Sequence, residues 1–136
     1  MTRMTLEDVL SWVKTLGTKA ERYYCGTLPN KQEHSFGVYQ LKESRKRDLA
    51  IGGEENTKTL VKGVTILVHW DRSTRATENA AQALYNELSS VGRVEIGGFE
   101  GCYIALASNE PVDVGADEDG IMEQVIDFVI YYSRKD

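Results

Sequence analysis

Two spacings of apolar residues alternate along the chain, and together they predict a sheet with helices. Apolar residues follow helical spacing over 6–16, after a possible N-terminal cap at Thr5, and again over 76–91. Runs typical of strands occupy 23–28, 36–41, 61–70, 94–96, 102–107, 111–114 and 121–132. This order predicts an α+β fold, with a single mixed, mostly antiparallel sheet and two helices packed on one of its faces.

Local patterns add detail to this arrangement. The run at 61–70 has apolar residues on both faces, which indicates a central strand. Asp119-Gly120 is a dipeptide typical of hairpin turns, so it should connect the last two strands. The second helix is expected to turn one stripe of residues toward the sheet: Ala76, Ala80, Ala83, Leu84, Leu88 and Val91.

The chain has 136 residues, which suits one domain spanning 1–136. A polar, irregular stretch at about 42–60 is too long for an ordinary connection in a compact domain, so we expect a mobile loop there. Its early part is basic, and it could contact DNA phosphates or simply be solvated: Lys42, Arg45, Lys46 and Arg47. Because no recognition helix or interleaved aromatic residue accompanies them, sequence-specific DNA reading is not expected.

Charge is distributed unevenly along the chain, whose formal net charge is −5. Residues 94–133 contain nine carboxylates and no Lys or Arg, whereas residues 1–93 contain 14 Lys and Arg against 11 Asp and Glu. The surface should therefore have a strongly acidic side and a more cationic side. No apolar run approaches the roughly 20 residues of a membrane helix, so no membrane partner is expected.

No arrangement of residues typical of catalysis occurs in the sequence. His34 lies in a polar stretch and is expected to be solvated, whereas His69 ends a buried strand and suits a hydrogen-bonded structural role. No serine stands in a nucleophile elbow, and Cys25 and Cys102 suit small buried residues in a reducing cytosol. The glycine pairs do not form a phosphate-binding loop. We therefore expect no enzyme activity and no cofactor.

Four carboxylates cluster around the predicted hairpin turn: Asp113, Asp117, Glu118 and Asp119. A solvated acidic hairpin is the favoured explanation, and a subunit contact is an alternative. A hard cation held by their oxygen atoms is a third interpretation, but the spacing does not match an EF-hand loop, and no metal is expected.

Three segments together resemble a known family. Residues 63–88 read GVTILVHWDRSTRATENAAQALYNEL, a strand ending in His-Trp, a polar corner and an alanine-rich helix. Residues 109–132 read NEPVDVGADEDGIMEQVIDFVIYY, and GVYQLKES and LAIGG precede both segments within 37–53. Nearly end to end, the chain resembles the minor capsid proteins of tailed bacteriophages and Gram-positive prophages. These are similar to tail-terminator and head–tail joining proteins.

The resemblance implies a structural virion protein of the phage neck, with a fold like that of tail terminators. Several copies, commonly six, would form or complete a ring at the head–tail junction, and DNA would pass through its lumen. Implied partners are the protein itself and other neck, tail-tube or portal-connector proteins. Implied locations are the virion and, during assembly, the host cytoplasm. The alternative is a small host enzyme that is nucleic-acid-associated or metal-dependent.

A ring of identical subunits needs two different surface patches that meet. We therefore expect the four clustered carboxylates to face Arg72, Arg75 or the basic 42–47 stretch of a neighbouring subunit. An acidic lumen, which repels DNA so that it slides, is a competing use of the same carboxylates.

Overall fold

The computed structural model describes residues 3–27, 32–41 and 59–133. This part of the chain contains two helices and seven strands, and the predicted α+β class is confirmed. The elements are α1 (Leu6–Val13), β1 (Arg22–Cys25), β2 (Ser35–Gln40), β3 (Thr59–His69), α2 (Thr74–Ser90), β4 (Val94–Ile96), β5 (Phe99–Leu106), β6 (Val112–Ala116) and β7 (Met122–Ser133). Most of the predicted long loop at about 42–60 lies outside the described residues.

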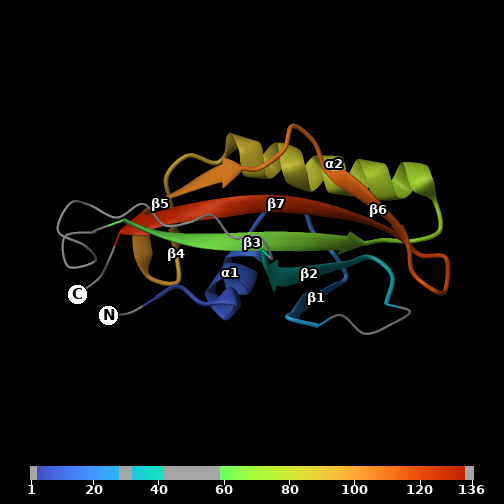
Figure 1. Cartoon of the computed structure of the whole chain (residues 1–136), viewed down its shortest axis with the longest axis horizontal. Helices are drawn as coiled ribbons and strands as arrows, with labels where there is room; N and C mark the ends of the chain where they lie inside the picture. The colour runs from blue at the N-terminus through green and yellow to red at the C-terminus, as the bar shows by residue number, and fades with distance from the viewer. Residues whose placement is uncertain (1–2, 28–31, 42–58, 134–136) are drawn as a thin grey trace.

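All seven strands belong to one sheet, in the order β1-β2-β3-β7-β5-β4, with β6 also paired to β7. Only the β1–β2 pair is parallel among these strands, so the predicted mixed and mostly antiparallel sheet is confirmed. The long central pair joins β3 to β7, from Thr59 opposite Ser133 to His69 opposite Glu123 (Figure 1). The run at 61–70 is thus a central strand, as its apolar residues predict.

Strands β5 and β6 lie one after the other along the same edge of β7. Leu106 pairs with Phe128, and after an interruption Val112 pairs with Val125. The interruption is anchored to α2, because the Tyr85 hydroxyl donates a hydrogen bond of 2.7 Å to the Ser108 carbonyl oxygen. No described strand pairs with the outer side of β6, which is therefore a free edge of the sheet.

Both helices cover one face of the sheet, where a single hydrophobic core of described residues forms. Alternate residues of β3 and β7 point into this core, among them Val64, Ile66, Phe128 and Ile130. The helices contribute these buried residues: Val9, Leu10, Trp12 and Val13 from α1, and Thr77, Ala81, Leu84 and Leu88 from α2.

The predicted inner stripe of α2 was partly wrong. Leu84 and Leu88 are buried as expected, but Thr77 and Ala81 complete the stripe, and Ala83 is exposed. Alanine occurs on either face of a helix with little cost, so an alanine-rich helix gives a weak periodic signal. The Thr77 hydroxyl tolerates burial because it donates to the Ser73 carbonyl oxygen at 2.8 Å.

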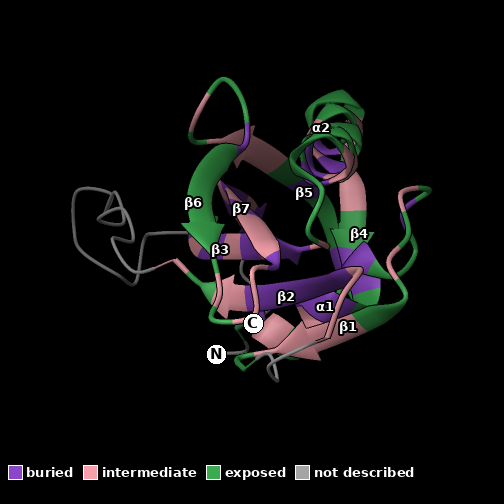
Figure 2. Cartoon of the chain, turned by 90° about the vertical axis from the view of Figure 1, so that its right-hand side faces the viewer, coloured by how far each residue is buried: buried purple, intermediate pink, exposed green. Residues whose placement is uncertain are grey.

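The sheet curls, and α1 lies where its two ends approach each other (Figure 2). Helix α1 contacts β1 and β2 at one end of the strand order and β4 at the other. Its first turn has a capping box: the Thr5 N–H donates to Asp8 Oδ2 at 2.9 Å, and the Asp8 N–H donates to Thr5 Oγ1 at 3.2 Å. Gly97, in the β4–β5 turn, lies directly against this Asp8 side chain.

Glu87 of α2 links the two helices. Its carboxylate accepts hydrogen bonds from the N–H groups of Gly17 and Thr18, at 2.6 and 2.7 Å, just after α1 ends. Partial burial raises the pKa of Glu87, but these N–H donors outweigh burial, and the net pKa lies below its ordinary value of 4.5. The charged form is therefore the one that stabilises the fold.

Glu87→Gln is expected to lower the free energy of unfolding at pH 7 by about 1 kcal/mol, a figure reduced for the partial solvent exposure of the carboxylate. Because the folded pKa is lowered, this contribution is present above the unfolded pKa and is lost as pH falls through the folded pKa. Urea unfolding at pH 7 and pH 3 measures it, with Glu78→Gln on the exposed side of α2 as control. An equal loss at both pH values would contradict the charge-dependent link.

Candidate functional site

The predicted hairpin turn connects β6 to β7 and is built around Asp117. The Asp117 N–H donates to the Ile121 carbonyl oxygen at 3.0 Å, and the Gly120 N–H donates to the Asp117 carbonyl oxygen at 3.1 Å. Gly120 has a φ of +80°, a conformation that favours glycine. Asp117 Oδ1 accepts the N–H groups of Asp119 and Ile121, at 2.9 and 3.0 Å. The Asp-Gly prediction is confirmed.

The buried His69 holds this turn against the end of β3. His69 Nε2 lies 2.7 Å from Asp117 Oδ2, and its Nδ1 lies 2.6 Å from the Gln32 carbonyl oxygen. Both ring nitrogens of His69 thus have an oxygen partner within its own chain. Glu123 Oε2 adds a second carboxylate 3.9 Å from Nε2. The predicted structural, hydrogen-bonded role of His69 is confirmed.

His69 lowers the pKa of both neighbouring carboxyl groups, but their net pKa shifts have opposite directions. Partial burial raises the pKa of Asp117, but the hydrogen bonds from His69 and from two backbone N–H groups outweigh burial, so that its pKa is lowered. The pKa of Glu123 is raised, chiefly because burial disfavours its charged form. Asp117 is thus a charged internal partner of His69, and its side chain is engaged within its own chain.

The prediction that His34 is solvated was wrong. Its Nδ1 lies 2.6 Å from Glu21 Oε2, its Nε2 lies 3.1 Å from Asp71 Oδ2, and its ring contacts Trp70 edge-on. The hydrogen bond with Asp71 is the main cause of a raised pKa for His34; partial burial opposes it and Glu21 adds to it. Sequence reasoning missed this pair of contacts because Glu21 and Asp71 belong to segments distant from His34 along the chain.

The remaining members of the acidic corner, which we define as Asp113, Asp117, Glu118 and Asp119, lie nearer the solvent. Asp113 and Glu118 are exposed, and Asp119 is half-buried. Arg72, expected to reach a neighbour, instead donates from Nε to the Asp119 carbonyl oxygen at 3.1 Å in its own chain. The predicted pairing between subunits stays a prediction.

The other residues predicted to contact a partner are Arg75 and the basic residues of the 42–47 stretch. Arg75 is exposed in the first turn of α2, and no hydrogen bond or ion pair is found for its side chain among the described residues. The basic residues predicted to contact a partner or DNA lie outside the described ranges: Lys42, Arg45, Lys46 and Arg47.

An exposed apolar feature, missed at the sequence level, lies beside the acidic corner. Every residue of β6 is exposed, and Val112 and Val114 keep 47% and 51% of their surface in solvent (Figure 2). Valine at half exposure on a free sheet edge is unusual, since such edges are normally protected by charged residues. The alternation of valine with polar residues in 111–114 was the available signal.

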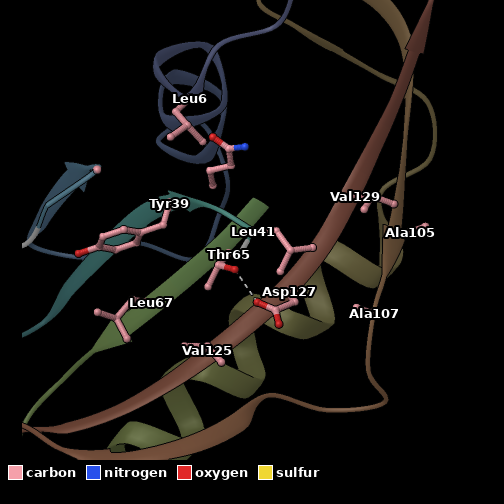
Figure 3. Close-up of a pocket in the computed structure, with 12 residues that line it drawn as sticks. Leu6, Tyr39, Leu41, Thr65, Leu67, Ala105, Ala107, Val125, Asp127 and Val129 are labelled. Atoms are coloured by element: carbon pink, nitrogen blue, oxygen red, sulfur yellow. Dashed lines mark hydrogen bonds between the residues drawn. The ribbon is translucent and has the colours of Figure 1, made fainter. Parts of the chain in front are cut away.

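The face of β3 and β7 that points away from the core forms part of a groove of about 960 Å³, which Leu6 of α1 also lines (Figure 3). Its lining is mainly apolar, with Leu67 and Val125 among the labelled side chains. Thr65 Oγ1 donates to Asp127 Oδ1 at 2.6 Å in the middle of the groove. This hydrogen bond links β3 to β7 across the groove and gives the Thr65 hydroxyl a partner.

Neither a metal centre nor a membrane span is found in the described part of the chain. No group of three or more His, Cys, Asp or Glu residues is placed there to hold a metal ion. Neither of the described helices has the length and apolar character that crossing a membrane requires. Cys25 and Cys102 are free thiols, and burial is the main cause of a raised pKa for each.

Comparison with known proteins identifies the family. The model of a family described as Bacteriophage tail terminator protein matches residues 5–134. Neither the curated proteins nor the solved structures provide a match to the chain. The family match covers nearly the whole chain, including the acidic corner and both helices. The chain therefore belongs to the bacteriophage tail terminator family, and it is a structural protein of the phage tail or neck.

Proposed function

We propose that this protein forms or completes a ring where the phage tail ends and the head joins, and that DNA passes through this ring. The family match over residues 5–134 carries the proposal, because a tail terminator acts at the end of the tail. As a member of this family the protein interacts with other tail or neck proteins. In the proposal these include the last ring of the tail tube and the portal connector, and residues 1–136 act as one domain.

The charge distribution supports both assembly and DNA passage. A ring of identical subunits, a hexamer in the proposal, uses two unlike patches on each subunit. Exposed carboxylates such as Asp113 and Glu118 provide one patch. Carboxylates left facing a lumen would repel phosphates, so DNA would slide without sequence-specific binding.

The proposal contains no catalytic step. In the described residues the best-placed ionisable groups, His69 with Asp117 and His34 with Asp71, bond each other and backbone groups. In the proposal these pairs hold the structure together, linking β3 and its neighbours to the turn before β7. We further propose that the protein is a virion component, assembled in the host cytoplasm of a Gram-positive bacterium.

Deleting the gene from its phage is expected to abolish production of infectious particles, at least 100-fold in titre, because tails would neither end correctly nor join heads. Negative-stain electron microscopy of lysates should show separate heads together with tails of irregular length. Supplying the intact gene in trans is the control and should restore joined particles. Normal virions from the deletion phage would rule out the proposed function.

A further inference from the structure

We propose that the subunit contact of this ring joins the β6 edge of one copy to the β1–α1 end of the next, with Asp113 facing Lys14. The inference rests on the proposed function and specifies which two surfaces of this chain meet. It replaces the expected partners Arg72 and Arg75, because Arg72 already lies at the acidic corner of its own chain. A head-to-tail contact requires two patches that are well separated on one subunit.

The strand register places these two patches at opposite ends of one row across the sheet. Asp113 pairs with Gln124, which pairs with Val68, Phe36 and finally Tyr23. Four steps of about 4.8 Å separate the ends by about 19 Å along the curled sheet. Figures 1 and 2 show β6 and β1 on opposite sides of the central pair β3 and β7.

The position of both patches in one row across the sheet affects whether a contact between them can close into a ring. Asp113 and Tyr23 lie at the same level along the strands, since paired residues of neighbouring strands stand beside each other. In the proposed contact the strands of neighbouring copies run side by side, so the two ends meet with little translation along the strands. A head-to-tail contact without such a translation is compatible with a closed ring, whereas one that does not close builds an open filament.

Charge complementarity favours a second copy of this chain as the occupant. The cationic end consists of three exposed residues around β1: Lys14, Lys19 and Arg22. Lys14 Nζ lies 5.9 Å from the centroid of the Tyr23 ring, at the end of the row. Near β6 three exposed carboxylates, Glu110, Asp113 and Glu118, outnumber the exposed cation Arg72, which bonds the Asp119 carbonyl oxygen. Two exposed acidic residues lie near β1: Glu21, which bonds His34, and Glu7, close enough to Cys25 to raise its pKa.

The half-exposed valines of β6 provide an apolar centre for the contact. Val112 and Val114 flank Asp113, so a partner that covers β6 removes apolar surface from water on both sides of this exposed carboxylate. Asp113 Oδ1 accepts the Gly115 N–H at 2.7 Å, which holds the carboxylate in place. The ladder between β6 and β7 is irregular between Asp113 and Gly115, and Gly115 has a φ of +95°. Such a bulge disfavours extension of the sheet by backbone pairing, so the contact is made by side chains.

Charge reversal on each side of the contact tests the pairing in the full-length protein. Asp113→Lys and Lys14→Glu are each expected to weaken self-association about tenfold, and the double variant should restore it. Light scattering and native mass spectrometry measure assembly at about 50 mM and 500 mM salt, where screening should weaken the wild type. Glu100→Lys, an equal charge change at an exposed position of β5, is the control and should assemble normally.

The same variants are also supplied in trans to the deletion phage, which tests assembly where tails are present. Each single variant should fail to restore titre, and the double variant should restore it. Circular dichroism confirms that every variant is folded. If both single variants assemble or complement like the wild type, or if the double variant stays as defective as the singles, the Asp113–Lys14 contact is overturned. Those outcomes leave the ring itself standing, whereas normal virions without the gene overturn the proposed function.

Discussion

Replacing His69 with alanine is expected to lower the free energy of unfolding by about 3 kcal/mol. The substitution removes the partner of Asp117 Oδ2 at 2.7 Å and of the Gln32 carbonyl oxygen at 2.6 Å, from a side chain that is only 2% exposed. Asp117 then loses its side-chain partner. The loss should lie at the low end of the range for breaking a buried pair, because Asp117 is 16% exposed and two backbone N–H groups still bond its Oδ1.

His34→Ala is the matched control, since His34 has the same arrangement of one ring between two acceptors. The His34 side chain is 33% exposed, against 2% for His69, so we expect a loss of only about 1 kcal/mol. The pKa of His34 is raised above 6.5 by Asp71, so its contribution is complete below the unfolded pKa and disappears as pH rises through the folded pKa.

Urea unfolding at pH 6 and pH 9 compares the two variants. Equal losses for His69→Ala and His34→Ala at pH 6 would show that burial does not govern these interactions. A cost of His34→Ala that grows toward pH 9 would contradict the assigned direction of its pKa.

Gly97→Ala is expected to destabilise the protein by about 2–3 kcal/mol, by strain in the backbone and by a clash with α1. Gly97 has a φ of +60°, a backbone conformation that residues other than glycine rarely adopt. A Cβ at this position would lie 2.5 Å from Asp8 Cγ, so the Asp8 side chain must move. Moving it breaks the capping box with Thr5 and loosens α1 where the helix joins the two ends of the sheet.

Gly101→Ala separates these two causes. Gly101 has a similar φ of +66°, but nothing lies within 4 Å of an added Cβ, so only the backbone strain of about 1 kcal/mol is expected. Thermal unfolding followed by circular dichroism gives both values. If Gly97→Ala costs no more than Gly101→Ala, the close approach of the β4–β5 turn to Asp8 contributes nothing to stability.

Elements with a strong local signal were predictable from the sequence. Phe128 and Ile130 alternate onto one face of a long strand, and Asp119-Gly120 forms the turn before it, because both features depend on residues close together along the chain. The family resemblance was predictable for the same reason, since it rests on contiguous segments, and the match over residues 5–134 confirms it.

The inner face of α2 was predicted only in part, and the contacts of His34 were not predicted. Alanines at 76, 80 and 83 suggested a stripe, yet the packed positions include Thr77 and Ala81, whose burial depends on where the sheet lies beneath the helix. His34 appeared isolated in a polar segment, although strand pairing brings Asp71 to within 3.1 Å of it. Neither feature has a local cause that a periodic pattern could reveal.

The proposed subunit contact shows most clearly which features follow from the local sequence and which depend on the tertiary structure. By itself the sequence determined the helical and strand periods, the hairpin turn and the concentration of nine carboxylates in residues 94–133. Only the tertiary structure shows that Asp117 bonds His69 and that Arg72 bonds the turn of its own chain. It alone places Asp113 and Tyr23 at opposite ends of one row of paired residues across the sheet. The physical reason is that local conformational preferences determine each helix, strand and turn, whereas strand register and packing determine which residues far apart along the chain come into contact.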